Sequence, residues 1–420
     1  MSTLHSLYKR HWALIPVVAA VIALLATHLW TVLDPYSPID TPSYFEAWER
    51  LKSCRIDCLR TPVYPVFAGL ITDIFGRPTA TVLIILVQTA LYLVSVYALA
   101  RICRDSLRMP RWLAIVATVP YYALYVFKAY QIYVITDAPA TSLTIIFALF
   151  YLRCLRRSRP VRFVLAGLFA GFLVLLRPSF LFIPIAMLMT APLARALPGR
   201  KARGSIVAAL ICLAITGAYT GIYFKKTGIP AISCVSDLNA VIMNANVYSG
   251  DYDRDSLPAH WIFDPEGKKE DPPRLLLHLP ALTNRAAEDP RFLREELRAV
   301  ETAHSGIKYR RTAYSIAGNL KYPIAGTRMR YILFPIVAVL YGLGLAINIR
   351  KRRSPAYIGR VFIWLLVCGL LAIVMLRAPD QYARLLMPVT PFVPVMCLDM
   401  AWLVIRGASL LHRGSCGSRE

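Results

Sequence analysis

Long apolar runs separated by short polar segments make up most of this 420-residue chain. Each run is about 15 to 22 residues long, close to the length that a helix needs to cross the hydrocarbon core of a bilayer. The pattern therefore predicts an all-α polytopic membrane protein with about ten transmembrane helices. Two short runs are separated by Arg177-Pro178 and could instead form one re-entrant hairpin. We place the helices near residues 13–33, 79–100, 112–128, 138–153, 163–176, 179–194, 204–224, 331–349, 358–376 and 385–405.

Two of the segments between apolar runs are long enough to carry function. The first, 34–78, contains an amphipathic stretch at 43–51 and a short apolar stretch at 63–75, which predict interfacial helices because neither is long enough to span. The second, 225–330, has mixed charge and one predicted helix at 290–304. We therefore divide the chain into an N-terminal transmembrane module (1–224, with 34–78 as its first outer loop), a large extracytoplasmic loop domain (225–330) and C-terminal transmembrane helices (331–420).

The charge distribution predicts the orientation of the chain. The net charge is +24, but 57% of the residues are hydrophobic and mean hydropathy is +0.51. The segments on one side of the predicted membrane hold 23 of the 48 basic residues and only two acidic ones, as cytoplasmic loops do. A nucleic-acid partner is not expected, since the basic residues do not gather on one face. We expect a multi-pass plasma-membrane protein with both termini cytoplasmic.

Ionisable side chains at the outer ends of the predicted helices are the candidates for chemistry. Charged groups at membrane depth are costly and mark functional sites. Arginine offers a planar fork and lysine a point charge to an anion such as phosphate, and an aspartate can act as a general base. These residue types predict an extracytoplasmic site for an anionic substrate. The group comprises Asp34, Asp40, Arg60, Lys128, Asp137, Arg177, Asp380 and Arg384.

Several of these residues lie in short motifs that follow one another in a recognisable order. The motifs are Asp40-Thr-Pro-Ser-Tyr44, Arg60-Thr-Pro-Val-Tyr64-Pro65, Thr136-Asp137-Ala-Pro139, the glycine-containing run 166–171 followed by Arg177-Pro178, and Gln381-Tyr382-Ala-Arg384. In this order they resemble the GT-C glycosyltransferases that use polyprenyl-phosphate sugars, in particular the group of protein mannosyltransferases and lipid A aminoarabinose transferases. The resemblance implies a GT-C-like fold and an inverting glycosyltransferase acting on the extracytoplasmic face.

The resemblance also implies a role for each candidate residue. Asp40 would be the general base, and Asp137 would position the acceptor or Asp40. If a divalent cation such as Mg²⁺ or Mn²⁺ is used, these two carboxylates would hold it. The donor would be a polyprenyl-phosphate-linked sugar, and the acceptor a glycolipid, a glycan or a protein. The remaining roles are binding of the donor phosphate (Arg60, Arg177, Arg384 and Lys128) and of substrate (Tyr44, Tyr64 and Tyr382).

Other interpretations of the same residues remain open. A polytopic transporter or lipid flippase is the alternative function, although its site should lie near the middle of the bilayer. Asp40 and Asp137 could simply cap helices, and the arginines could extend to lipid headgroups. Asp399 lies away from the predicted site, and pairing with a neighbouring helix is its expected role. Cys54 and Cys58 either form a disulfide or remain two unpaired thiols.

Overall fold

The computed structural model describes residues 11–26, 40–124, 127–128, 130–157, 159–195, 197, 201–248, 261–263, 275–277, 279–303, 306–321, 332–349, 353–377 and 385–416. The first half contains η1 (Trp12–Leu14), α2 (Ile15–Ala26), α3 (Asp40–Lys52), α4 (Val63–Phe75), α5 (Arg77–Arg101), η3 (Ile102–Ser106), α6 (Arg111–Ala123), α8 (Asp137–Arg156), α9 (Pro160–Leu176), η4 (Pro178–Leu181), α10 (Phe182–Ala194) and α11 (Lys201–Thr227). The second half contains α12 (Val235–Tyr248), β1 (Trp261–Phe263), β2 (Leu275–Leu277), α13 (Leu279–Glu288), α14 (Arg291–Ala303), α15 (Ile307–Lys321), α16 (Leu333–Ile347), α17 (Pro355–Arg377) and α19 (Phe392–Cys416).

Every predicted apolar run has a helix in the structure. By length and composition, four helical segments within the described residues could cross a membrane: Arg77–Ser106, Asp137–Arg156, Lys201–Thr227 and Pro355–Leu376. The apolar helices α2, α9, α10 and α16 are shorter. The helix predicted at 112–128 is shorter in the structure, where α6 stops at Ala123. The last predicted helix, 385–405, begins only at Phe392 because Pro388 and Pro391 interrupt the preceding turns.

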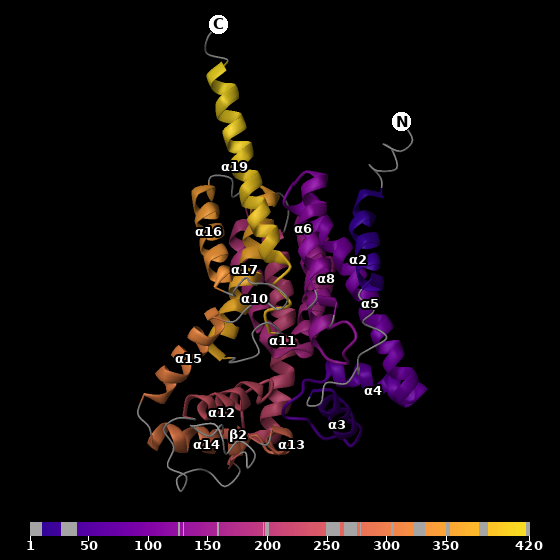
Figure 1. The fold of residues 1–420 in the computed structure, drawn as a ribbon, viewed down its shortest axis with the longest axis vertical. Coiled ribbons are helices and arrows are strands. Elements are labelled where there is room, and N and C mark those ends of the chain that lie inside the picture. The colour runs from indigo at the N-terminus through magenta and orange to yellow at the C-terminus, as the bar shows by residue number, and fades with distance from the viewer. Residues whose placement is uncertain are drawn as a thin grey trace.

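The helices form a bundle whose two ends differ in character. Figure 1 shows the start of α2 and the end of α19 at one end of the bundle, and α3 together with α12, α13 and α14 at the other. The predicted interfacial stretches are helical, as α3 and α4, and α4 has the bounds predicted for the apolar stretch. We call the end that carries α3 and α12 to α14 the loop end of the bundle.

Close packing of α9 on α11 fixes the position of the break that follows α9. A Cβ on Gly167 would lie 2.6 Å from the carbonyl oxygen of Ala208, and one on Gly171 would lie 2.7 Å from Cδ1 of Ile215. Glycines four residues apart therefore let two helices approach closely, as in other membrane helix pairs. The glycine-containing run has a packing role, and it anchors the helix from which Arg177 emerges.

The residues between α11 and α16 form a second, smaller packing unit. α12 packs against α14 and α15, and α15 contacts α17. The strands β1 and β2 pair antiparallel, with Ile262 opposite Leu276. The helix predicted at 290–304 is confirmed as α14. A small apolar cluster that includes Leu59, Tyr223, Leu238 and Leu293 joins this unit to the segment after α3.

A buried ion pair holds α16, α17 and α19 together. The Arg360 guanidinium donates to both carboxylate oxygens of Asp399, at 2.7 and 2.9 Å, and the Tyr341 hydroxyl donates to the same carboxylate at 2.7 Å. Arg360 also donates to the carbonyl of Leu107 at 2.7 Å. The expectation that Asp399 pairs with a neighbouring helix is confirmed.

Candidate functional site

Asp40 and Arg60 form an ion pair at the loop end of the bundle. Asp40 is the first residue of α3, and its Oδ1 lies 2.5 Å from Nη2 of Arg60. Both side chains are largely buried, at 14% and 16% exposure. Nε of Arg60 also donates to Ser43 Oγ at 2.9 Å. The two motifs, which lie twenty positions apart in the sequence, therefore meet as one ion pair.

The backbone around Arg60 is held by Asp57. One carboxylate oxygen of Asp57 accepts from the N–H groups of Leu59 and Arg60, at 2.9 and 2.6 Å, and the other lies 2.5 Å from Arg50. Burial raises the pKa of Asp57, against the opposing effect of these donors. A capped turn of this kind presents the Arg60 side chain in one direction.

Tyr44 links this pair to the start of α8. Its hydroxyl lies 3.0 Å from Thr136 Oγ1 and accepts from Arg60 at 3.4 Å, and its ring stacks under the guanidinium at 4.5 Å. Tyr64 packs edge-on behind Tyr44, with ring centroids 4.8 Å apart, and donates its hydroxyl to Gln88 at 3.0 Å. Tyr44 is therefore the tyrosine in contact with the charged groups, whereas Tyr64 supports it from the core.

A second ion pair, Asp137 with Arg177, lies beside the first. Asp137 is the first residue of α8 and is completely buried, and its Oδ1 lies 2.9 Å from Nη1 of Arg177. Arg177 has an extended backbone because it precedes Pro178, which ends α9 and starts η4. The break in the helix turns the guanidinium toward α8.

These groups surround a small cavity of about 100 Å³. Its lining includes Asp40, Tyr44, Arg60 and Arg177, so the charged groups come from both ion pairs. We call it the polar pocket. An apolar cavity of about 810 Å³, the apolar pocket, shares five lining residues with it: Arg177, Pro178, Val235, Asn239 and Leu385. The rest of the apolar pocket is lined mainly by η4, α11, α17 and the chain leading into α12.

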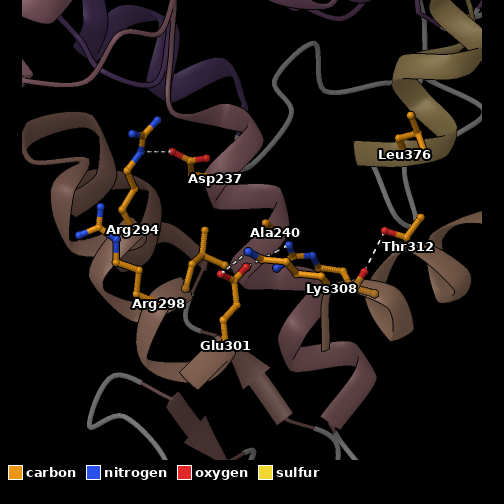
Figure 2. A pocket seen from close by; sticks show the side chains of 10 residues that line it. Asp237, Ala240, Arg294, Arg298, Glu301, Lys308, Thr312 and Leu376 are labelled. Carbon is orange, nitrogen blue, oxygen red and sulfur yellow. Dashed lines mark hydrogen bonds and ion pairs between the residues drawn. The ribbon is translucent and has the colours of Figure 1, made fainter. Parts of the chain in front are cut away.

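A further pocket lies mainly in the large loop unit, and most of its lining residues are charged. It has a volume of about 580 Å³. Figure 2 shows Arg294 paired with Asp237, at 3.0 Å, and Glu301 facing Lys308, at 3.0 Å. Leu376 of α17 also lines it. Its opposite charges largely pair with one another.

The structure brings four of the predicted charged residues together and leaves one apart. Asp40, Arg60 and Arg177 line the polar pocket, and Asp137 pairs with Arg177. No described hydrogen bond or ion pair joins Lys128, which is buried, to any of them. Tyr382 and Arg384 lie outside the described residues, although the next residue, Leu385, lines both pockets.

Sequence reasoning did not propose Thr61, Val235 or Asn239 for the site, yet all three line the polar pocket. Thr61 lies inside a quoted motif, so its position was the available signal. Val235 and Asn239 belong to α12, and no residue of the large loop was predicted to belong to the site. The wall that this loop contributes is therefore visible only in the structure.

The two predicted cation ligands are both already paired with cationic side chains. Arg60 lies against Asp40, and Arg177 against Asp137. Among the residues that the structure describes, no group of three or more His, Cys, Asp and Glu side chains could hold a metal ion. A divalent cation would have to compete with two guanidinium groups, so this carboxylate pair does not fit one well.

Part of the chain matches a known protein family in sequence. The sequence profile of the family described as dolichyl-phosphate-mannose-protein mannosyltransferase matches residues 59–222, which include Arg60, Asp137 and Arg177. No curated protein matches the sequence significantly. The profile covers less than half of the chain, and it includes much of the polar pocket's lining.

Two solved structures have a similar fold. One is the oligosaccharyltransferase AglB from Archaeoglobus fulgidus in complex with an inhibitory peptide and a dolichol-phosphate, with a TM-score of 0.53. The other is the apo form of the Archaeoglobus fulgidus oligosaccharyltransferase, with a TM-score of 0.54. Each is 13% identical to this chain, and the match covers 97% of this chain and 52% of the other. The chain thus spans about half the length of these proteins.

The comparisons confirm the predicted fold class. The chain is a helical, polytopic membrane protein with a GT-C-like fold. The matching family is described as a mannosyltransferase family, and both similar structures are described as an oligosaccharyltransferase.

Proposed function

We propose that the chain is an inverting glycosyltransferase that moves a sugar from a polyprenyl phosphate to a cell-envelope acceptor on the extracytoplasmic face. The observation that carries the proposal is the junction of the two pockets. A polar pocket bordered by a carboxylate and two guanidinium groups joins an apolar pocket of about 810 Å³. An amphiphilic donor with an anionic head and a hydrocarbon tail matches such a junction.

Asp40 is the proposed general base. It takes the proton of an acceptor hydroxyl while that oxygen attacks the anomeric carbon of the donor sugar. The bond from the anomeric carbon to the phosphate oxygen breaks, and its electron pair leaves with the polyprenyl phosphate. Attack opposite the leaving group inverts the configuration of the anomeric carbon.

Arg60 and Arg177 are the proposed partners of the departing phosphate. Negative charge develops on the phosphate as the sugar leaves, and fixed cationic donors stabilise that charge in a partly dehydrated site. Both guanidinium groups are largely buried, at 16% and 10% exposure. Asp137, behind Arg177, is proposed to hold that guanidinium in place. Lys128 and Arg384 stay predicted phosphate ligands, and Tyr382 a predicted substrate contact.

The pairing of Asp40 with Arg60 suggests how donor binding activates the base. A carboxylate held 2.5 Å from a guanidinium is a weaker base than one that is free of it. A phosphate that binds Arg60 competes with Asp40 for the same donors. The donor would thus release the carboxylate for proton transfer only when the leaving group is already in position.

Three observations support the donor class and the side of the membrane. AglB, whose fold this chain shares, is described in complex with a dolichol-phosphate. The family whose profile matches is described by a dolichyl-phosphate sugar donor. The loops rich in basic residues predict a cytoplasmic position for the end of the bundle opposite to the polar pocket. The acceptor is a hydroxyl of a glycolipid, a glycan or a protein.

The decisive experiment replaces Asp40 by Asn and measures sugar transfer in membranes supplied with polyprenyl-phosphate-linked mannose or aminoarabinose. We expect turnover to fall by about 10²- to 10⁴-fold, the usual contribution of a general base. Asp73→Asn is the matched control, because Asp73 belongs to the same outer loop but contacts Trp48 and Lys52 instead. Unchanged turnover in correctly inserted Asp40→Asn protein would contradict the role.

The transporter alternative is tested in the same preparation. Its charged site should lie near the middle of the bilayer, whereas the two ion pairs lie at the ends of α3, α8 and α9. Solute or lipid translocation by reconstituted protein, with no sugar transfer from any of the offered donors, would overturn the proposal in favour of the transporter.

A further inference from the structure

Two buried cysteines meet where the first outer loop touches the large loop unit. Cys58 is 3% exposed and Cys234 is 1% exposed, and both belong to the same apolar cluster. Both are free thiols in the structure. They are 176 positions apart in the sequence, and neither takes part in the chemistry proposed above.

The backbones of the two residues are directly hydrogen-bonded. The N–H of Cys234 donates to the carbonyl oxygen of Cys58 at 2.9 Å, and the Tyr223 hydroxyl donates to the same oxygen at 3.2 Å. In a hydrogen-bonded pair of antiparallel segments, the Cα atoms lie roughly 5.5 Å apart. Disulfides need Cα atoms roughly 4.4–6.8 Å apart. The backbone spacing therefore suits a disulfide.

Both sulfur atoms also face the same neighbour, the last turn of α13. Sγ of Cys234 lies 3.4 Å from the carbonyl oxygen of Ala286, and Sγ of Cys58 lies 4.0 Å from that of Glu288. Between these two contacts, the N–H of Cys58 donates to Ala287 at 2.9 Å. Both thiols therefore contact the same turn of α13, and their backbones are joined by a hydrogen bond.

Cys54 does not share this environment. It is exposed, it follows the end of α3 and it has a positive φ of 55°. The other cysteines for which the structure gives an environment, Cys103, Cys154, Cys212, Cys368 and Cys397, lie in the segments 102–106, 137–156, 201–227, 355–377 and 392–416. Cys234 is therefore the natural partner for Cys58.

We propose that Cys58 and Cys234 form a disulfide that ties the first outer loop to α12. The inference rests on the proposed function in one respect, the extracytoplasmic position of both loops, where oxidation is possible. Each thiol loses a proton and the two sulfur atoms join. The two electrons and two protons reduce the disulfide of a thiol–disulfide oxidoreductase in that compartment to a dithiol.

The bond would fix two walls of the polar pocket relative to each other. Cys58 follows Asp57, which holds the Arg60 backbone, and Cys234 precedes Val235 at the start of α12. Val235 and Asn239 line both pockets. The link therefore joins the segment that presents the phosphate-binding arginine to the segment that closes the pocket above it.

The burial of Cys58 indicates when the bond forms. Burial raises the pKa of the Cys58 thiol to about 11. Because the thiolate is the reactive form, a docked Cys58 reacts slowly. Oxidation would therefore precede complete docking of the loops, and the finished bond would be protected from external reductants.

Peptide mapping of the wild-type full chain tests the proposal directly. Membranes are lysed in N-ethylmaleimide to block free thiols, and the unfolded protein is digested with trypsin without reductant. Cleavage after Lys52, Arg55, Arg60, Lys226 and Arg254 places Cys54, Cys58 and Cys234 on three separate peptides. We expect residues 56–60 linked to residues 227–254, and maleimide on Cys54.

Serine variants supply an independent readout. Cys58→Ser and Cys234→Ser should each lower the melting temperature of the purified protein by about 5 °C or more. Reduction of the unfolded wild type before refolding should have the same effect. Cys54→Ser is the matched control and should leave the melting temperature unchanged.

The outcomes separate this proposal from the proposed function. Maleimide on both Cys58 and Cys234, or a link from Cys58 to Cys54, would overturn the disulfide even if Asp40→Asn abolishes transfer as expected. A Cys58–Cys234 link in a protein whose transfer does not depend on Asp40 would support the disulfide and contradict the catalytic assignment.

Discussion

Buried aspartate–arginine pairs lie at both ends of the helix bundle, and they are built differently. The pair Asp399–Arg360, at the end opposite to the loop end, is bidentate, and the carboxylate also accepts from Tyr341. At the loop end, Asp40–Arg60 and Asp137–Arg177 are ion pairs at 2.5 and 2.9 Å. Among the pockets that the structure describes, those lined by members of these three pairs lie at the loop end.

Buried charge inside a membrane protein can therefore have two different roles. A carboxylate whose hydrogen-bonding positions are filled by its own chain is stabilised and holds helices together. An arginine that borders a cavity as well as a carboxylate can exchange its partner for a ligand. Pairs of the same residue types, all largely buried, are thus predicted to hold helices together at one end and to bind ligand at the other. The following variants test that distinction.

The largest effect is expected from Arg360→Ala. It leaves the completely buried Asp399 without its cation, which costs about 3–5 kcal/mol of unfolding free energy. Denaturant unfolding of purified protein measures the loss, and transfer per folded molecule should be unchanged. The double variant Arg360→Met with Asp399→Leu should recover most of the stability. A large fall in turnover at unchanged stability would contradict a structural role for this pair.

Arg177→Lys should have the next largest effect, on activity rather than stability. Lysine keeps the charge but loses the planar fork of the guanidinium. The charge-assisted hydrogen bond to the donor phosphate that is lost with the fork is worth about 1.5–3 kcal/mol. We expect kcat/KM for the lipid-linked donor to fall by about 10- to 100-fold. Arg294→Lys, the same change at a pair outside the polar pocket, is the control and should leave kcat/KM unaltered. Equal losses of kcat/KM in Arg177→Lys and Arg294→Lys would contradict a special role for arginine at the polar pocket.

Tyr44→Phe and Tyr64→Phe form a matched pair with a smaller effect. Each removes one hydroxyl, at a cost of about 1 kcal/mol. The Tyr44 hydroxyl contacts Arg60 and Thr136, so its loss should lower transfer by about fivefold. The Tyr64 hydroxyl donates to Gln88, so its loss should lower stability and leave turnover intact. Transfer kinetics and melting curves of the two variants measure these effects. A loss of turnover in Tyr64→Phe but not in Tyr44→Phe would contradict the expectation.

The smallest effect is expected from Asp57→Asn, through the pH dependence of stability. Burial raises the pKa of Asp57 above its ordinary value of 3.8, so the folded state binds this proton more tightly than the unfolded state. Wild-type stability should therefore fall as pH rises from about 4 through the raised pKa. The variant should lack this component of the pH dependence. An unfolding series between pH 4 and pH 7 measures the slopes, and equal slopes would contradict the expected shift.

Much of the fold could be predicted from the sequence because an apolar run of membrane length is a strong signal. The bounds of α4 agree with the apolar stretch at 63–75, and α14 agrees with 290–304 within one residue. Helix ends were harder where proline intervenes. The turns around Pro388 and Pro391 delay α19, because proline removes a backbone donor and clashes with the preceding turn.

Only part of the candidate site could be predicted. The short motifs placed Asp40, Arg60, Asp137 and Arg177 on the outer side of the predicted membrane. In the structure they form two ion pairs, Asp40–Arg60 and Asp137–Arg177. The contribution of α12 was not readable, because a wall made by long-range packing leaves no periodic pattern in its own segment. For the same reason, sequence spacing drew attention to Cys54 beside Cys58 and gave no sign of Cys234.

The lining of the polar pocket has a consequence for biosynthesis. It combines Asp40, near the beginning of the chain, with Asn239 and Leu385, which are made much later. A ribosome must therefore deliver nearly every helix to the membrane before the pocket has all of its walls. Nascent chains that stop before Leu385 would carry the acid and both arginines without one wall of the pocket, so we expect sugar transfer only after synthesis has passed that residue.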